Sequence, residues 1–201
     1  MPIKLSRSFY ERDKVVIIAQ ELLGKVLCTN FDGVITKGII VETEAYNGLN
    51  DKACHAHFAG KTKRTKIMYD RGGFAYIYLC YGIHHLFNVV TNIKGNADAV
   101  LVRAIEPIEG IHHILQRRKK KKLERSVGGG PGIVSQALGI HTLHYGTDLL
   151  GNTIWIEDHK KVVKKDQIIA SPRVGVDYAE EDAFLPWRFR IVDNPFTSPA
   201  K

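Results

Sequence analysis

Short apolar runs separated by turn residues recur through most of the chain, and this pattern constrains the fold more than any other feature. The clearest case is the pair of runs Lys25–Thr29 and Val34–Glu42, which flank Asp32-Gly33. An Asp-Gly pair between two such runs is a strong signal for a β-hairpin. Further strands are expected at Phe74–Cys80, Leu86–Thr91, Ala99–Ile105 (closed by Pro107), Thr153–Ile156, Ile168–Ala170 and Arg188–Val192.

Helical patterns are fewer. They predict helices at Asp13–Leu23, with Asp13 as the cap, at Glu109–Gln116, and at Ile133–Leu138 after a break at Gly128–Gly132. The polar segment Asn47–Gly73 is typical of a long functional loop with one short helix. No repeat, linker or regular β-α-β alternation is visible. The sequence, residues 1–201, therefore predicts one α+β domain with a curved, mostly antiparallel mixed sheet flanked by a few helices. The order of the strands stays open.

The composition excludes some classes of protein. The chain has 201 residues and three cysteines without a C-x-x-C pair, which argues against a disulfide framework and favours a reducing cytoplasm. No apolar run has membrane-spanning length and the first residues show no signal segment, so no membrane association is expected. The net charge is +8, and the unbroken run Arg117–Lys122 is either a solvated face or a phosphate-binding surface.

Two carboxylates stand two residues apart at the end of an expected strand. Strand geometry places Glu42 and Glu44 on the same face. A strand end that opens into a polar loop is a suitable position for a catalytic acid or base. The alternative is that both are solvated strand residues.

Aromatic residues crowd the segment after the loop. Phe74, Tyr76 and Tyr78 alternate along one expected strand and share a face, which can either stack on nucleobases or pack into the core. Tyr81 differs from them, because it precedes a glycine at a strand end and can protrude.

One interpretation of the histidine pattern is a metal site. His55, His57, His84 and His85 together with a carboxylate could bind zinc. No H-E-x-x-H motif and no cysteine-rich ligand spacing accompany them, so no metal is expected. The glycine-rich break at 128–132 also lacks the G-K-[ST] ending of a phosphate loop, so nucleotide hydrolysis is not expected.

A series of motifs covers nearly the whole chain, from about Leu23 to P-W-R-F at 186–189. It comprises V-E-T-E-A-Y-N-G at 41–48, D-x-A-x-H at 51–55, G-x-T-x-R at 60–64, Y-I-Y-x-x-Y-G at 76–82 with Asn88 following, L-V-R-A-I-E-P at 101–107, and G-P-G at 130–132 with Q-A-L-G-I at 136–140. In order and spacing these motifs resemble the alkyladenine (3-methyladenine) DNA glycosylase family. Ile133 departs from the family pattern, which often has a basic residue after the Gly-Pro-Gly turn.

The resemblance implies a role for each matching residue. Glu44 matches the general base that activates the attacking water, and Arg103 matches a residue beside that water and the DNA backbone. The residues matching those that surround the flipped base are Tyr46, His55 and Tyr78.

Four further residues match the family at the rim and the walls of its site. Asn88 matches a pocket residue that helps to exclude normal guanine. Tyr81 matches the side chain wedged into the gap that the flipped nucleotide leaves. Thr62 and Arg64 lie in a segment expected near phosphate.

The resemblance also implies the partners and the reaction. The partner is double-stranded DNA with damaged purines, and the enzyme is monofunctional, leaves an abasic site and needs no cofactor. We expect a monomer, located in the cytoplasm with the nucleoid of a prokaryote or in the nucleus of a eukaryote. The ranking of 3-methyladenine, 7-methylguanine and hypoxanthine stays open. Two alternatives remain: a catalytically idle damage-binding protein of the same fold, and a metal-dependent nuclease that uses the histidines.

Overall fold

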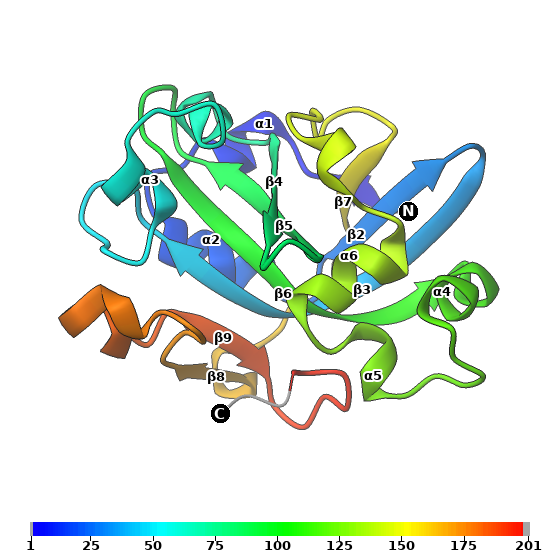
Figure 1. Ribbon diagram of the computed structural model, residues 1–201. Helices are drawn as coiled ribbons and strands as arrows, with labels where there is room; N and C mark the ends of the chain where they lie inside the picture. The colour runs from blue at the N-terminus through cyan, green and yellow to red at the C-terminus, as the bar shows by residue number, and fades with distance from the viewer. Residues whose placement is uncertain (1, 199–201) are drawn as a thin grey trace.

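One antiparallel sheet organises residues 2–198, which are the residues that the computed structural model describes (Figure 1). Its main path runs β1-β7-β2-β3-β6-β5-β4. The strands of this path are β1 (Ile3–Lys4), β2 (Val26–Phe31), β3 (Val34–Tyr46), β4 (Ala75–Cys80), β5 (His84–Thr91), β6 (Asp98–Glu109) and β7 (Ile154–Asp158). Two further strands, β8 (Ile168–Ser171) and β9 (Arg188–Ile191), pair with each other, and β9 joins β3.

The long strand β3 divides the sheet. Its first half pairs with β2 as far as Ile39, and Glu42 to Glu44 pair with β9. β6 runs along the other edge of both halves, with register shifts around Glu42. The second half of β3 is therefore paired along both edges, and residues 40–45 are buried.

Helices cover both faces of this sheet. α2 (Val15–Glu21) buries Val15, Ile18 and Ala19 against β3 and β6, and lies behind them in Figure 1. On the front, α6 (Pro131–Leu138) packs on β5 and β6 and contacts α4 (Ile111–Arg118) and α5 (Arg125–Gly128). The remaining helices are α1 (Arg7–Tyr10), α3 (His55–Ala59) and the 3₁₀ turns η1 (Lys66–Tyr69), η2 (Thr142–His144), η3 (Lys165–Gln167) and η4 (Asp177–Phe184). The predicted α+β domain with a mostly antiparallel sheet is confirmed.

Both predicted tight turns are present. Asp32 and Gly33 have φ of 54° and 80° between β2 and β3, and Tyr81 and Gly82 have 50° and 71° between β4 and β5. In the two-residue loop Asp32-Gly33, positive φ at both central residues matches the twist of the flanking strands. The β4–β5 loop also contains Ile83, because Cys80 pairs with His84.

Two expectations about element ends are wrong. Asp13 does not cap α2: Lys14 stands at the N-cap and no side chain caps the helix. β6 does not end before Pro107 but continues to Glu109. Pro107 pairs with Gly38 next to a register shift, and an irregularity of this kind is where a strand tolerates a residue without an N–H.

The structure bears on two of the exclusions drawn from the composition. Within residues 2–198 no helix is long and apolar enough to cross a membrane. In the same range Cys28, Cys54 and Cys80 are free thiols, and the first two are buried.

Candidate active site

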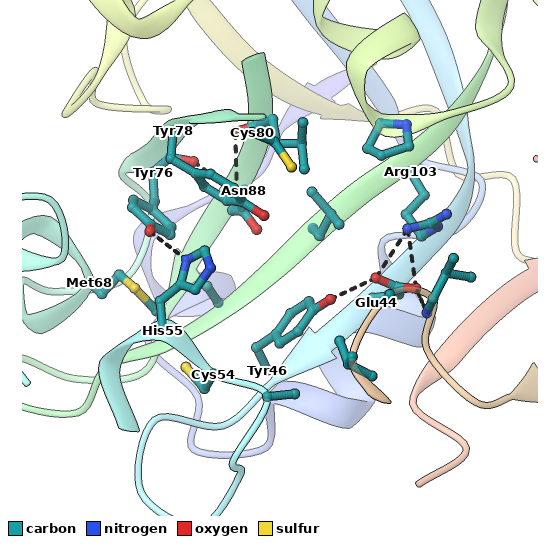
Figure 2. Close-up of a pocket in the computed structure, with 18 of the residues that line it drawn as sticks. Glu44, Tyr46, Cys54, His55, Met68, Tyr76, Tyr78, Cys80, Asn88 and Arg103 are labelled. Atoms are coloured by element: carbon teal, nitrogen blue, oxygen red, sulfur yellow. Dashed lines mark hydrogen bonds and ion pairs between the residues drawn. The ribbon is translucent and has the colours of Figure 1, made fainter. Parts of the chain in front are cut away.

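A cavity of about 470 Å³ opens between the second half of β3, the β4–β5 hairpin, α3 and the segment before η4. Most of the residues singled out in the sequence line it: Glu44, Tyr46, His55, Arg64, Tyr78, Tyr81, Asn88 and Arg103. Figure 2 shows the Glu44–Arg103 pair on one side of this cavity and an aromatic wall on the other, with Tyr46 between them. The fold therefore brings together residues that are up to 59 positions apart in the chain.

The Glu44 carboxylate is fully buried and held by three different donors. The Tyr46 hydroxyl donates to its Oε2 at 2.8 Å, and the backbone N–H of Val174 donates to its Oε1 at 2.9 Å. Arg103 Nη1 lies 3.3 Å from the same carboxylate. These three contacts fix the position and orientation of the carboxylate.

Arg103 joins the two carboxylates that the sequence placed on one face of β3. Its Nε donates to Glu42 at 3.1 Å while its Nη1 contacts Glu44. Burial opposes the charge of this arginine, but attraction to Glu44 and Glu42 outweighs it, so the pKa of Arg103 is raised. Glu42 is turned away from the cavity and also accepts bonds from the backbone N–H and hydroxyl of Ser198, at 2.6 and 2.7 Å.

The aromatic wall comes from α3 and β4. The ring centroids of Tyr76 and Tyr78 are 5.4 Å apart, and the His55 ring lies edge-on to Tyr78 at 4.6 Å. Burial raises the pKa of both tyrosines, that of Tyr76 to about 12, so the rings remain neutral phenols. Asn88 lies beside them with its amide fixed, since Nδ2 donates to the carbonyl oxygens of Tyr76 and Leu86 at 3.1 and 3.3 Å.

His55 is positioned as a neutral hydrogen-bonding residue. Its Nδ1 lies 2.8 Å from the Tyr76 hydroxyl, and its Nε2 lies 2.7 Å from Arg64 Nη2. Because a guanidinium can only donate, the ring must accept from it. Burial, and then the charge of Arg64, lower the pKa of His55 to about 4.

This lowered pKa predicts a pH-dependent stability. Between the ordinary histidine value of 6.5 and about 4, the unfolded chain binds a proton at His55 that the folded chain does not. Stability should therefore fall as the pH is lowered through this window. In urea unfolding at a series of pH values, the free energy of unfolding should fall more steeply for the wild type than for His55→Gln. Parallel curves would show that His55 titrates alike in both states.

Tyr81 stands at the mouth of the cavity and not in its wall. It occupies the tip of the β4–β5 hairpin with a left-handed backbone, and 89% of its side chain is exposed. Its neighbours along the hairpin, Leu79 and Ile83, are also exposed. The tip is thus an apolar and largely exposed projection at the edge of the cavity.

The predicted phosphate-contact residues come from the segment between α3 and η1, beside the cavity. Arg64 is exposed and places its guanidinium 4.9 Å from the centroid of the Tyr78 ring. Thr62 lines an adjoining recess with Arg64, while its hydroxyl lies 3.0 Å from that of Thr65 in a local turn. Both are therefore near the cavity, and neither is part of its floor.

The basic run is structurally divided. Arg117 donates to Thr36 and to the carbonyl of Ala137, and Arg118 donates to the carbonyl of Ser126, so these two hold α4 to its surroundings. Lys119, Lys121 and Lys122 are exposed. Arg117 and Arg118 thus hold α4 in place, a role that neither reading of the run included, and the exposed lysines are compatible with both readings.

The histidines do not form a metal site. Across residues 2–198 no group of three or more histidine, cysteine, aspartate or glutamate residues is placed to hold a metal ion. His57 instead contacts the carbonyl of Leu49, and His85 accepts from the backbone of Thr142.

Sequence reasoning missed one part of the site. Arg173 and Val174 approach Glu44 and Tyr46 from the segment between β8 and η4, and no sequence motif singled them out. Asp51 belonged to a matched motif but had no role, and the structure pairs it with Arg173. A buried aspartate and a buried arginine 122 residues apart give no local signal that they will meet.

Comparisons with known proteins match nearly the whole chain. A family model described as methylpurine-DNA glycosylase matches residues 8–195. A protein of Chlamydia felis is 48% identical over 93% of this chain and 95% of its own length, and one of Clostridium tetani is 43% identical over 98% and 99%. A third, from Desulfitobacterium hafniense, is 42% identical over 97% and 98%. All three carry the name "Putative 3-methyladenine DNA glycosylase". The chain therefore belongs to the methylpurine-DNA glycosylase family.

Proposed function

We propose that this protein removes alkylated or deaminated purines from duplex DNA by hydrolysing the N-glycosidic bond with a water that Glu44 activates. The observation that carries the proposal is a fully buried carboxylate on one side of a cavity whose other side is a wall of neutral aromatic rings. A base that enters such a cavity has stacking surfaces, and its sugar faces a proton acceptor. The product is an abasic site.

The chemistry requires only one proton acceptor. The oxygen of the water attacks the anomeric carbon, the bond from that carbon to the purine nitrogen breaks, and its electron pair leaves with the base. Glu44 takes the proton that the water loses. Because Tyr46, Val174 and Arg103 hold the carboxylate in place, it does not have to reorganise when it acts as the general base.

The aromatic wall favours damaged bases over normal ones. Alkylation at N3 or N7 makes a purine cationic, and the electron-rich faces of Tyr46 and Tyr78 attract a cation. Asn88 is fixed by two hydrogen bonds to backbone carbonyls, so it cannot move aside for the extra amino group of guanine. Damage also weakens base pairing, which lowers the cost of extrusion.

A base-release assay tests this function. Duplexes that each carry one 3-methyladenine, 7-methylguanine or hypoxanthine are incubated with the protein in excess chelator and scored for abasic sites. Release of any of the three supports the proposal. Binding to the lesion duplexes without release would identify a catalytically idle damage-binding protein, and strand cleavage that chelator abolishes would identify a nuclease.

Tyr81 is expected to act on extrusion of the base and not on the chemical step. A wedge that replaces the extruded base stabilises the open duplex, and an aromatic stack contributes about 1–3 kcal/mol. Tyr81→Ala should therefore lose about tenfold in rate for each 1.4 kcal/mol of that contribution when the target is well paired. The loss should be smaller opposite a base that pairs poorly.

The measurement is single-turnover release of hypoxanthine opposite thymine and opposite a poorly pairing base. Tyr78→Ala is the matched control, because a wall residue is needed however easily the base leaves the helix. Equal losses for Tyr81→Ala on the two duplexes would rule out the wedge.

A further inference from the structure

A fully buried ion pair between Arg173 and Asp51 lies beside the cavity. Arg173 Nη1 and Nη2 contact the two carboxylate oxygens of Asp51 at 2.5 and 2.8 Å, and both side chains are fully buried. The same guanidinium donates to the carbonyl oxygens of Ala45 and Asp182, each at 3.0 Å. Asp51 in turn accepts from the backbone N–H groups of Asn47 and Ala53. The pair therefore joins the segment after β8 to the end of β3 and to the loop before α3.

Arg173 also packs against the site itself. Its guanidinium lies 4.9 Å from the centroid of the Tyr46 ring and 5.2 Å from that of Trp187. Tyr46 donates to one oxygen of Glu44, and Val174, the next residue after Arg173, donates its backbone N–H to the other. Two of the three groups that hold the Glu44 carboxylate thus adjoin Arg173: the Tyr46 ring packs against its guanidinium, and Val174 follows it in the chain.

Two buried side chains anchor the segment 172–176. One is Arg173, and the other is Val176, which packs in a cluster with Ala53 and Tyr46. Between them lies Gly175, with φ of 73°, where an added Cβ would contact nothing within 4 Å. Val174 therefore lies between the Arg173 anchor and an open glycine, so Arg173 is the anchor nearest to its N–H.

We propose that Arg173 and Asp51 are positioning residues. Their ion pair fixes the 172–176 segment and the Tyr46 ring, and so maintains the hydrogen bonds that Val174 and Tyr46 donate to Glu44. The inference rests on the proposed role of Glu44 as the general base. A buried ion pair adds little stability on balance, because desolvation of the two charges offsets their attraction. Its value here is geometric, since a displacement of about 1 Å at a reacting group can cost about 10²-fold in rate.

The test compares two substitutions at one position. Arg173→Met keeps the length of the side chain and removes its charge and donors. Arg173→Lys keeps the charge but cannot make the paired contacts of a guanidinium. The matched control is Arg7→Met, which breaks the ion pair of Arg7 with Asp148 outside the cavity. For each variant we would measure the single-turnover rate of base release at saturating enzyme, the Kd for a duplex with an abasic-site analogue, and Tm.

A positioning role predicts a rate that falls while binding is retained. Arg173→Met should lose about 10–100-fold in the single-turnover rate, Arg173→Lys should lose less, and the Kd should change little in both. Arg7→Met should lower Tm without changing the rate, because saturating enzyme makes the rate constant insensitive to an unfolded fraction. Rates of Arg173→Lys and of any folded Arg173→Met that equal the wild-type rate would overturn the inference. An inactive wild type would instead overturn the proposed function.

Discussion

Glu44→Gln should lose about 10²–10⁴-fold in the single-turnover rate of base release and keep its affinity for damaged duplex DNA, since this is the usual cost of removing a general base. Val174 and Tyr46 accommodate glutamine at position 44, while Arg103 Nη1, 3.3 Å from both oxygens of Glu44, can donate only to the amide oxygen. The amide oxygen can accept from the Val174 N–H, and the amide NH₂ can donate to the hydroxyl oxygen of Tyr46. The variant therefore changes the proton acceptor and leaves the cavity otherwise intact.

The chain supplies a matched control two residues away. Glu42→Gln is the same chemical change on the same strand and beside the same Arg103, but this carboxylate faces Ser198 and not the cavity. Its rate should fall far less than that of Glu44→Gln. Both rates are measured by single-turnover release, with binding followed separately on a duplex that carries an abasic-site analogue. A Glu44→Gln rate near that of the wild type would mean that another group activates the water.

The local features of this fold were predictable because they depend on neighbouring residues. Asp32-Gly33 and Tyr81-Gly82 adopt the positive φ values of hairpin turns, as their sequences indicate. The predicted end of β6 was wrong because it came from a rule of the same local kind. A proline normally stops a strand, but Pro107 pairs with Gly38 next to a register shift. The residue that makes the proline tolerable lies on another strand, almost 70 residues away, so a rule based on neighbouring residues does not detect it.

The start of α2 illustrates a second limit. Asp13 has the residue type of an N-cap, yet the helix begins without a side-chain cap. The helix is instead held through its apolar face and through Thr43, whose hydroxyl donates to the carbonyl of Ala19 at 2.8 Å. Tertiary packing on the buried half of β3 outweighs the contribution of about 1 kcal/mol that a cap typically makes.

The site, too, has parts that the sequence predicted and parts that it did not. The motifs around Glu44, Tyr78 and Arg103 carried a resemblance that predicted which residues would meet, and the cavity contains them. The supports of those residues were not predictable. Glu42 accepts two hydrogen bonds from Ser198, which lies 156 positions away in the chain. Arg173 and Asp51, which form an ion pair, are 122 positions apart. Long-range pairs of this kind follow from the order of the strands, which the sequence left open.

Removing Arg103 should destabilise the protein strongly. Its side chain is 9% exposed and stands between two carboxylates that are fully buried. Breaking a buried ion pair from one side leaves an uncompensated charge and typically costs about 3–5 kcal/mol. Because Glu42 keeps Ser198, and Glu44 keeps Tyr46 and Val174, we expect the loss for Arg103→Met to lie near about 3 kcal/mol.

Urea unfolding of three variants tests this expectation. Arg12→Met breaks an ion pair with Glu21 whose side chains are 38% and 44% exposed, and it should cost no more than about 1 kcal/mol. The double variant Arg103→Met with Glu42→Gln removes one of the stranded charges and should recover part of the stability that Arg103→Met loses. If Arg103→Met costs no more than Arg12→Met, or if the double variant recovers nothing, the two carboxylates do not depend on Arg103 for their charge compensation. The arginine would then serve only the reaction at Glu44, and its loss would appear in the rate of base release and not in the free energy of unfolding.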